Sequence, residues 1–75
     1  MITDKTLAVQ LSKMLLEISG QLDTSVAVVQ GKCSDEEFNA YRRGAATVMW
    51  ELYDQLLRPL YKTHPDLKPA ELEIG

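Results

Sequence analysis

The arrangement of this chain is decided by eight residues near its middle, GKCSDEEF at positions 31–38. Ser34 followed three residues later by Glu37 is the pattern of a capping box, in which each side chain bonds the backbone amide of the other residue. Cys33 and Phe38 occupy the two positions of a hydrophobic staple around that cap. The glycine that opens the stretch is a common helix stop. One helix is therefore predicted to end, and a second to begin, within a few residues of each other.

Upstream of this stretch, residues 4–30 are predicted to form one long helix. Apolar residues recur there at steps of three or four, close to the 3.6-residue repeat of an α-helix. Thr3 is expected to cap the helix, with Asp4 in its first turn against the helix dipole. The repeating apolar residues are Leu7, Leu11, Leu15, Ile18, Leu22, Val26 and Val29.

Downstream, a second helix is predicted over residues 35–57. Pro59 is expected to kink or end it, because proline has no amide to donate and crowds the preceding turn. The tail 59–75 contains three prolines and is expected to pack irregularly on the hairpin or to be partly mobile. The apolar repeat of this second helix is Phe38, Tyr41, Ala45, Val48, Leu52 and Leu56.

The short connection makes the two helices antiparallel neighbours in one domain, residues 1–75, so the fold class is an all-α helical hairpin. With the turn centred near residue 32, Gly20 falls opposite Gly44. Each glycine costs about 1 kcal/mol inside a helix, so a shared reason for both is attractive. The hypothesis is that they let the two backbones approach closely at one crossing. Leucine at either position would then force the helices apart.

A chain of 75 residues has a marginal core, and chains of this size usually need a crosslink, a metal or self-association. Its single cysteine and single histidine allow neither an intrachain disulfide nor a structural zinc site. On a straight helix, Trp50, Tyr53 and Leu57 turn outward beside the apolar stripe that faces the first helix. A dimer forming a four-helix bundle, with Trp50 and Tyr53 at the interface, would cover them. Alternatively, the C-terminal tail covers Trp50 within the monomer.

Charge and composition narrow the class of partner. The net charge is −3 and the pI about 4.9, without the clustered basic face of a nucleic-acid-binding protein. Arg42 and Arg43 point about 100° apart, and the lysines are scattered along the chain. No apolar run approaches the ~18 residues of a membrane span, and the N-terminus lacks the pattern of a secretion signal. A lone thiol suits a reducing compartment, so a cytoplasmic protein is expected.

No strong catalytic motif is present. His64 would need a nucleophile or carboxylate held beside it to act as a base. Cys33 is followed by three acidic residues, which oppose thiolate formation, so a staple role is favoured. Glu51 and Asp54 lack the Glu-x-x-His partners of di-iron bundles. No enzyme activity, metal or cofactor is therefore expected.

The segment Pro59-Leu60-Tyr61, continued by His64-Pro65-Asp66-Leu67-Lys68-Pro69 and Leu72, resembles the tail of small uncharacterised bacterial α-helical proteins. Tyr41-Arg42-Arg43 resembles the entry to the helix that precedes that tail. The resemblance covers roughly the C-terminal half. It implies a bacterial or phage-derived cytoplasmic protein and brings no activity and no functional residues.

The sequence therefore favours a non-enzymatic protein–protein interaction or regulatory module that acts as a helical homodimer, with another protein as a further partner. A bundle that binds a small anionic ligand between subunits is the first alternative, and a nucleic-acid-associated regulator is the second. The expected working surface comprises Trp50, Tyr53, Leu57 and Tyr61, with Arg42 and Arg43 nearby.

Overall fold

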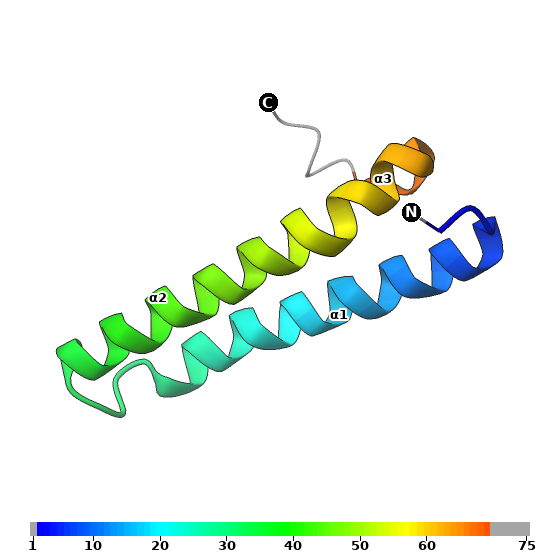
Figure 1. The fold of residues 1–75 in the computed structure, drawn as a ribbon. Helices are drawn as coiled ribbons and strands as arrows, with labels where there is room; N and C mark the ends of the chain where they lie inside the picture. Colours follow the sequence, from blue (N-terminus) through cyan, green and yellow to red (C-terminus); the bar gives the residue numbers. More distant parts are fainter. Residues whose placement is uncertain (1, 70–75) are drawn as a thin grey trace.

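The structure is a computed structural model that describes residues 2–69, and within this range every regular element is helical, with no strand. Helix α1 runs from Lys5–Val29 and α2 from Asp35–Leu52. A π-helical turn at Tyr53–Leu57, helix α3 at Arg58–Thr63 and a 3-10 turn at Pro65–Leu67 follow. Figure 1 shows α1 and α2 side by side and antiparallel. The predicted all-α hairpin is confirmed.

Local sequence signals explain both helix starts. The side chain of Asp4 accepts a hydrogen bond from the amide of Leu7 at 3.2 Å, so Asp4, not the predicted Thr3, caps α1. The predicted capping box of α2 is present, with Ser34 Oγ accepting from the Glu37 amide at 3.1 Å. The Ser34 amide donates back to Glu37 Oε1 at 3.1 Å. In the connection, Gly31 has φ of 78°, a left-handed conformation that favours glycine.

The capping box also makes the stability of the start of α2 depend on pH. Hydrogen bonds from the backbone amide and then the hydroxyl of Ser34 lower the pKa of the Glu37 carboxyl below its ordinary value. A carboxyl with a lowered pKa in the folded state contributes stability above its unfolded pKa, and that contribution is lost as the pH falls through the folded pKa. The cap is therefore fully formed at neutral pH and weakens in acid.

The second helix does not end near residue 57 as predicted. It continues past Pro59 to Thr63, because the turn before the proline widens. The Arg58 amide donates to the carbonyl of Tyr53, five residues back, where an α-helix would use the carbonyl four residues back. In an unbroken α-helix, the Pro59 ring would clash with the carbonyl four residues before it. The π turn takes up this conflict without ending the helix.

The π turn also changes which side chains face α1. One extra residue in the turn rotates everything after it by about 100° relative to a straight helix. Leu57, Leu60 and Tyr61 thereby face inward and are only 3%, 1% and 6% exposed. This corrects the prediction that Leu57 and Tyr61 belong to an outward-facing patch. Both are core residues of the hairpin.

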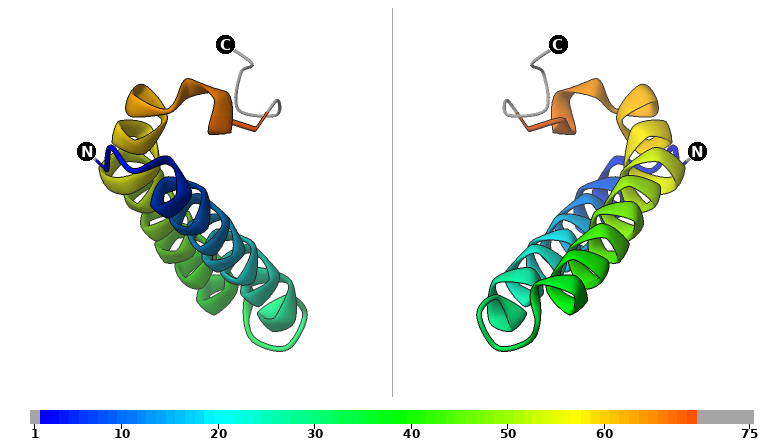
Figure 2. Two further views of the ribbon diagram at one scale, coloured as in Figure 1. Left: turned by 90° about the vertical axis from the view of Figure 1, so that its right-hand side faces the viewer. Right: turned by 90° about the vertical axis from the view of Figure 1, so that its left-hand side faces the viewer.

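The segment after the π turn is bonded back to the start of α1. The Tyr61 hydroxyl lies 3.3 Å from Ser12 Oγ, and His64 Nε2–H donates to the carbonyl of Ile2 at 2.7 Å. Lys5 pairs with Asp66, and its hydrogen bond lowers the pKa of the Asp66 carboxyl. Figure 2 shows this segment turning across the open end of the hairpin, beside the N-terminus. Residues 59–69 of the tail thus pack on the hairpin, while residues 70–75 lie outside the described range.

The predicted close crossing at Gly20 and Gly44 is wrong for this hairpin. A Cβ atom built on either glycine meets no atom within 4 Å, so neither backbone position is crowded by the other helix. Both residues are exposed. The buried contact positions are instead Ala8 and Ser12 on α1 and Ala45 on α2.

We therefore expect Gly20→Ala to stabilise the protein by about 1 kcal/mol, because alanine favours the helix by that amount over glycine. This corresponds to a rise in Tm of about 4–8 °C for a domain of this size. Thermal unfolding followed by circular dichroism at one chain concentration measures the change. Gly31→Ala is the matched control and should destabilise, since its φ is positive. A lower Tm for Gly20→Ala would restore the close-crossing hypothesis.

Candidate functional site

The hairpin buries few of its apolar side chains. The buried apolar residues of the described range are Ala8, Ala45, Leu57, Leu60 and Tyr61. Ten larger apolar side chains remain at least 36% exposed, and most fall on two faces, one on either side of the line where α1 and α2 meet. They are Leu7, Val9, Met14, Leu16, Ile18, Val28, Tyr41, Val48, Trp50 and Leu56.

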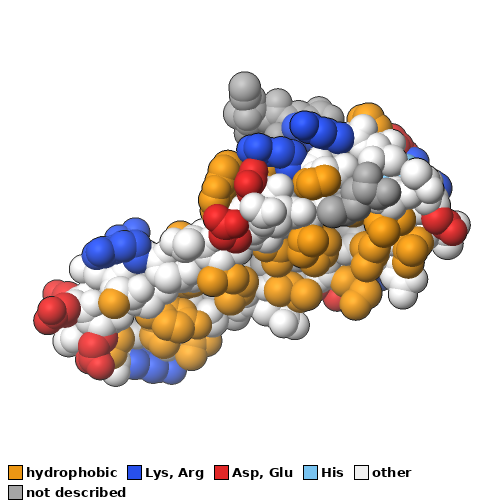
Figure 3. Space-filling view, viewed as in Figure 1, with side chains coloured by type: hydrophobic (Ala, Val, Ile, Leu, Met, Phe, Trp, Pro, Cys, Tyr) orange, Lys and Arg blue, Asp and Glu red, His pale blue; other side chains and the backbone are white. Residues whose placement is uncertain are grey.

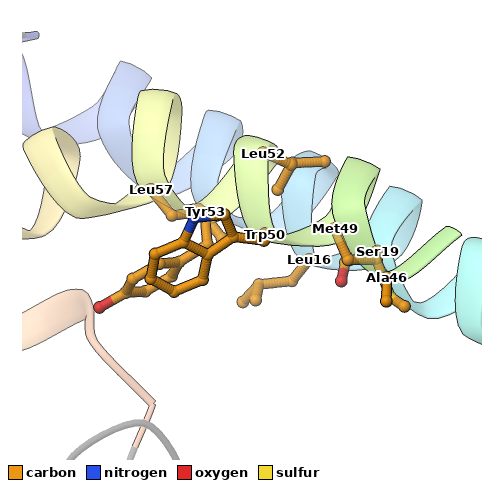
Figure 4. Close-up of a pocket in the computed structure, with 8 residues that line it drawn as sticks. All are labelled: Leu16, Ser19, Ala46, Met49, Trp50, Leu52, Tyr53 and Leu57. Atoms are coloured by element: carbon orange, nitrogen blue, oxygen red, sulfur yellow. The ribbon is translucent and has the colours of Figure 1, made fainter. Parts of the chain in front are cut away.

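The first face carries a groove of about 470 Å³ around Trp50, hereafter the Trp50 groove. Trp50 is 55% exposed on α2, while Leu16 and Ser19 of α1 form the opposite side. Figure 4 shows the Trp50 and Tyr53 rings close together, with the Tyr53 hydroxyl pointing toward the segment that follows α3. The full lining is Leu16, Ser19, Ala46, Met49, Trp50, Leu52, Tyr53 and Leu57.

Arg58 holds the two aromatic rings of this groove in place. The Trp50 and Tyr53 ring centroids are 5.8 Å apart, and Arg58 Cζ lies 5.7 Å from each centroid. At this distance a guanidinium is attracted to the electron-rich ring faces. The same guanidinium forms an ion pair with Asp54 one turn earlier, at 2.8 Å. Arg58 is therefore in contact with both aromatic rings and is itself held by the ion pair with Asp54.

A second hollow, of about 490 Å³, adjoins the Trp50 groove and shares Tyr53 with it. Three cations line it, so we term it the basic pocket; its members are Tyr53, Arg58, Tyr61, Lys62, Pro65 and Lys68. Within the described residues, Lys62 and Lys68 form no ion pair. The sequence treats these lysines as scattered, but the turn after α3 brings Lys68 back toward Lys62. The result is a local positive site on a chain of net charge −3.

Arg42 and Arg43 are not part of this site. Both are exposed on α2, and neither lines the Trp50 groove or the basic pocket. Arg42 lies eight residues before Trp50, which is about 12 Å along the helix axis. The arginine that the structure places beside the aromatic residues is Arg58.

The second face lies on the other side of the hairpin, and we term it the Ile18 face. With Ala8 as the inward direction of α1, its α1 members fall at about −40° to −120°, and no charged residue of α1 lies in that arc. Tyr41 and Val48 of α2 extend the face across the other helix, and Tyr41 Oη bonds Ser25 Oγ at 2.7 Å. Figure 3 shows a band of hydrophobic side chains along the two helices. The α1 members are Leu7, Leu11, Met14, Ile18 and Leu22.

Leu7, Leu11, Ile18 and Leu22 belong to the apolar repeat from which the first helix was predicted. The periodicity correctly identified an apolar stripe along the helix, but it does not show which way that stripe faces. The structure turns the buried Ala8 and Ser12 toward the second helix, so the centre of the leucine stripe is displaced to one side. Leu7, Met14 and Ile18 are consequently 42%, 50% and 44% exposed.

The candidate catalytic and metal-binding residues have structural roles or lie apart from one another. The His64 ring is buried and bonded to a backbone carbonyl. Cys33 is exposed, and its thiol donates to the Val29 carbonyl at 3.5 Å. Across residues 2–69, no three His, Cys, Asp or Glu side chains come together as metal ligands do. Within the same range, no helix is long and apolar enough to span a bilayer.

The fold and its surfaces define a small helical hairpin with two apolar faces and one local basic site. In comparisons with known proteins, the chain matches no protein-family model, no curated protein and no solved structure. The resemblance to small bacterial helical proteins therefore stays a prediction. The function is argued below from the two faces themselves.

Proposed function

We propose that this chain is a non-enzymatic protein-interaction module that acts as a homodimer, in which two hairpins pair through the Ile18 face as a four-helix bundle. The exposed apolar side chains of the Ile18 face carry the proposal. Leu7, Met14 and Ile18 of α1 are 42%, 50% and 44% exposed, and Tyr41 and Val48 of α2 are 42% and 52% exposed. Apolar side chains gathered on one exposed face mark a protein–protein interaction surface.

The Ile18 face fits this role better than the Trp50 groove. It spans both helices and is free of charged residues on α1, and a two-fold axis through such a face pairs apolar surface with apolar surface. The Trp50 groove adjoins Arg58, Lys62 and Lys68. Pairing two copies there would bring like charges together, which opposes association. The proposal therefore moves Trp50 and Tyr53 out of the dimer interface and leaves the Trp50 groove outside it.

Light scattering on a sizing column, across a concentration series, tests the dimer. The parent chain should have twice the monomer mass of 8.4 kDa. Ile18→Glu should reduce it to the monomer mass, because the interface would have to bury an unpaired carboxylate. Val28→Glu is the matched control, since Val28 is 54% exposed and lies on the far side of α1 from α2. It should leave the dimer intact.

Two results would overturn the proposal. A parent chain that stays monomeric through the whole series would show that the Ile18 face does not self-associate. A dimer that persists in Ile18→Glu but dissociates in Trp50→Glu would return the interface to the Trp50 groove.

A further inference from the structure

We infer that the Trp50 groove and the basic pocket form one docking site for a short segment that alternates apolar and acidic side chains, and that its occupant is the chain's own residues 70–75. The inference concerns the surface that the proposed dimer leaves free. It stands or falls separately from the dimer, because the two surfaces share no residue.

The site has an apolar part and a cationic part in direct succession. Leu16, Met49 and Trp50 supply the apolar part, whose lining contains two hydroxyl side chains, Ser19 and Tyr53, and no charged residue. Tyr53 belongs to both hollows and joins them. A segment crossing the site would therefore place apolar side chains against Trp50 and carboxylates near Lys62 and Lys68.

Residues 70–75 have the matching chemistry. They read Ala-Glu-Leu-Glu-Ile-Gly, so Leu72 and Ile74 are apolar and Glu71 and Glu73 are acidic. Lys62 and Lys68 form no ion pair within the described residues, and so two carboxylates can pair with them without breaking an existing pair. Burying Leu72 or Ile74 against Trp50 adds about 25 cal/mol for each Å² of apolar surface removed from water.

The segment also has the reach. Lys68 lines the basic pocket, and only Pro69 separates it from residue 70. Six residues extend to about 20 Å, while the Tyr53 and Trp50 rings are 5.8 Å apart. A covalently attached segment this close to its site has an effective concentration in the millimolar range. Even a weak contact is therefore populated within one chain.

Fluorescence of Trp50, the only tryptophan, tests the docking in the full-length chain. In Glu71→Lys/Glu73→Lys, the segment should leave the site, so quenching by acrylamide should increase and the emission maximum should move to longer wavelength. Glu17→Lys/Glu36→Lys makes the same change in net charge at exposed positions away from the site and should behave as the parent chain. High salt should reproduce the effect in part on the parent chain, because it screens exposed charges.

The hydrophobic half is tested by Leu72→Asp/Ile74→Asp, which should expose Trp50 in the same way. A synthetic peptide of residues 70–75 added to Glu71→Lys/Glu73→Lys should restore the protection of Trp50. Equal quenching in the parent and both tail variants would overturn the inference. Protection that disappears on dilution would overturn the intramolecular occupant and assign the site to the tail of a second copy. Ile18→Glu keeps these readouts separate, since a monomer should still protect Trp50.

Discussion

Leu60→Ala is expected to lower the free energy of unfolding by about 2–5 kcal/mol, the range for removing a buried leucine side chain. Leu60 is 1% exposed and is the one large side chain of the described range that is completely enclosed. A domain of 75 residues has a total stability of only about 4–11 kcal/mol. One substitution thus removes a large share of it. Urea unfolding followed by circular dichroism at 222 nm measures the loss.

Leu56→Ala is the matched control for this experiment. Leu56 lies four residues before Leu60, in the π turn, but is 41% exposed, so Leu56→Ala should lose far less stability. Both variants and the parent are compared at one chain concentration, because self-association adds to the apparent stability. Equal losses would contradict the packing described here, in which the π turn directs Leu60 onto α1.

Ala8→Leu is expected to destabilise the protein by about 1–3 kcal/mol, the usual effect of adding methylenes to a filled interior. Ala8 has no exposed surface, and it lies one helical turn before Ser12, whose hydroxyl meets Tyr61. A larger side chain at position 8 would push the segment after the π turn away from α1. The same urea titration measures the change.

Ala27→Leu is the control, because Ala27 occupies the same helix but is exposed. It should stay within about 0.5 kcal/mol of the parent chain, as surface substitutions usually do. If Ala8→Leu instead raised the stability, the contact between the start of α1 and α3 would contain a void that leucine fills, and the close packing of the two segments would be wrong.

Much of the fold follows from short stretches of sequence. Residues 31–38 predict a helix stop, a capping box and a helix start, and all three are present. These features depend on neighbours within about four residues, so the chain determines them wherever it folds. The aromatic residues were partly predicted in the same way, since Trp50 is exposed as a straight helical wheel requires.

The prediction that the second helix ends near residue 57 failed because two local preferences compete there. Proline at position 59 argues for a helix end, whereas the apolar residues after it argue for continued contact with α1. The π turn satisfies both, and its extra residue moves Tyr61 from the outer surface into the core. No local pattern in this chain predicts a π turn. The prediction of a close crossing at the two glycines failed for a related reason. Their positions in the sequence suggested the crossing, but the packed helices do not approach each other closely there.

The sequence by itself therefore determined the two long helices, the antiparallel hairpin, the cap of α2 and the shortage of buried core. All of these depend on interactions within a turn or on the total amount of apolar surface. Only the tertiary structure decided which way the helices face, and with it the two exposed surfaces. The reason is geometric: a rotation of one residue leaves every local contact nearly unchanged but turns a side chain by about 100°. The basic pocket needs the additional turn at Pro65, which sets Lys68 beside Lys62 and next to Tyr53.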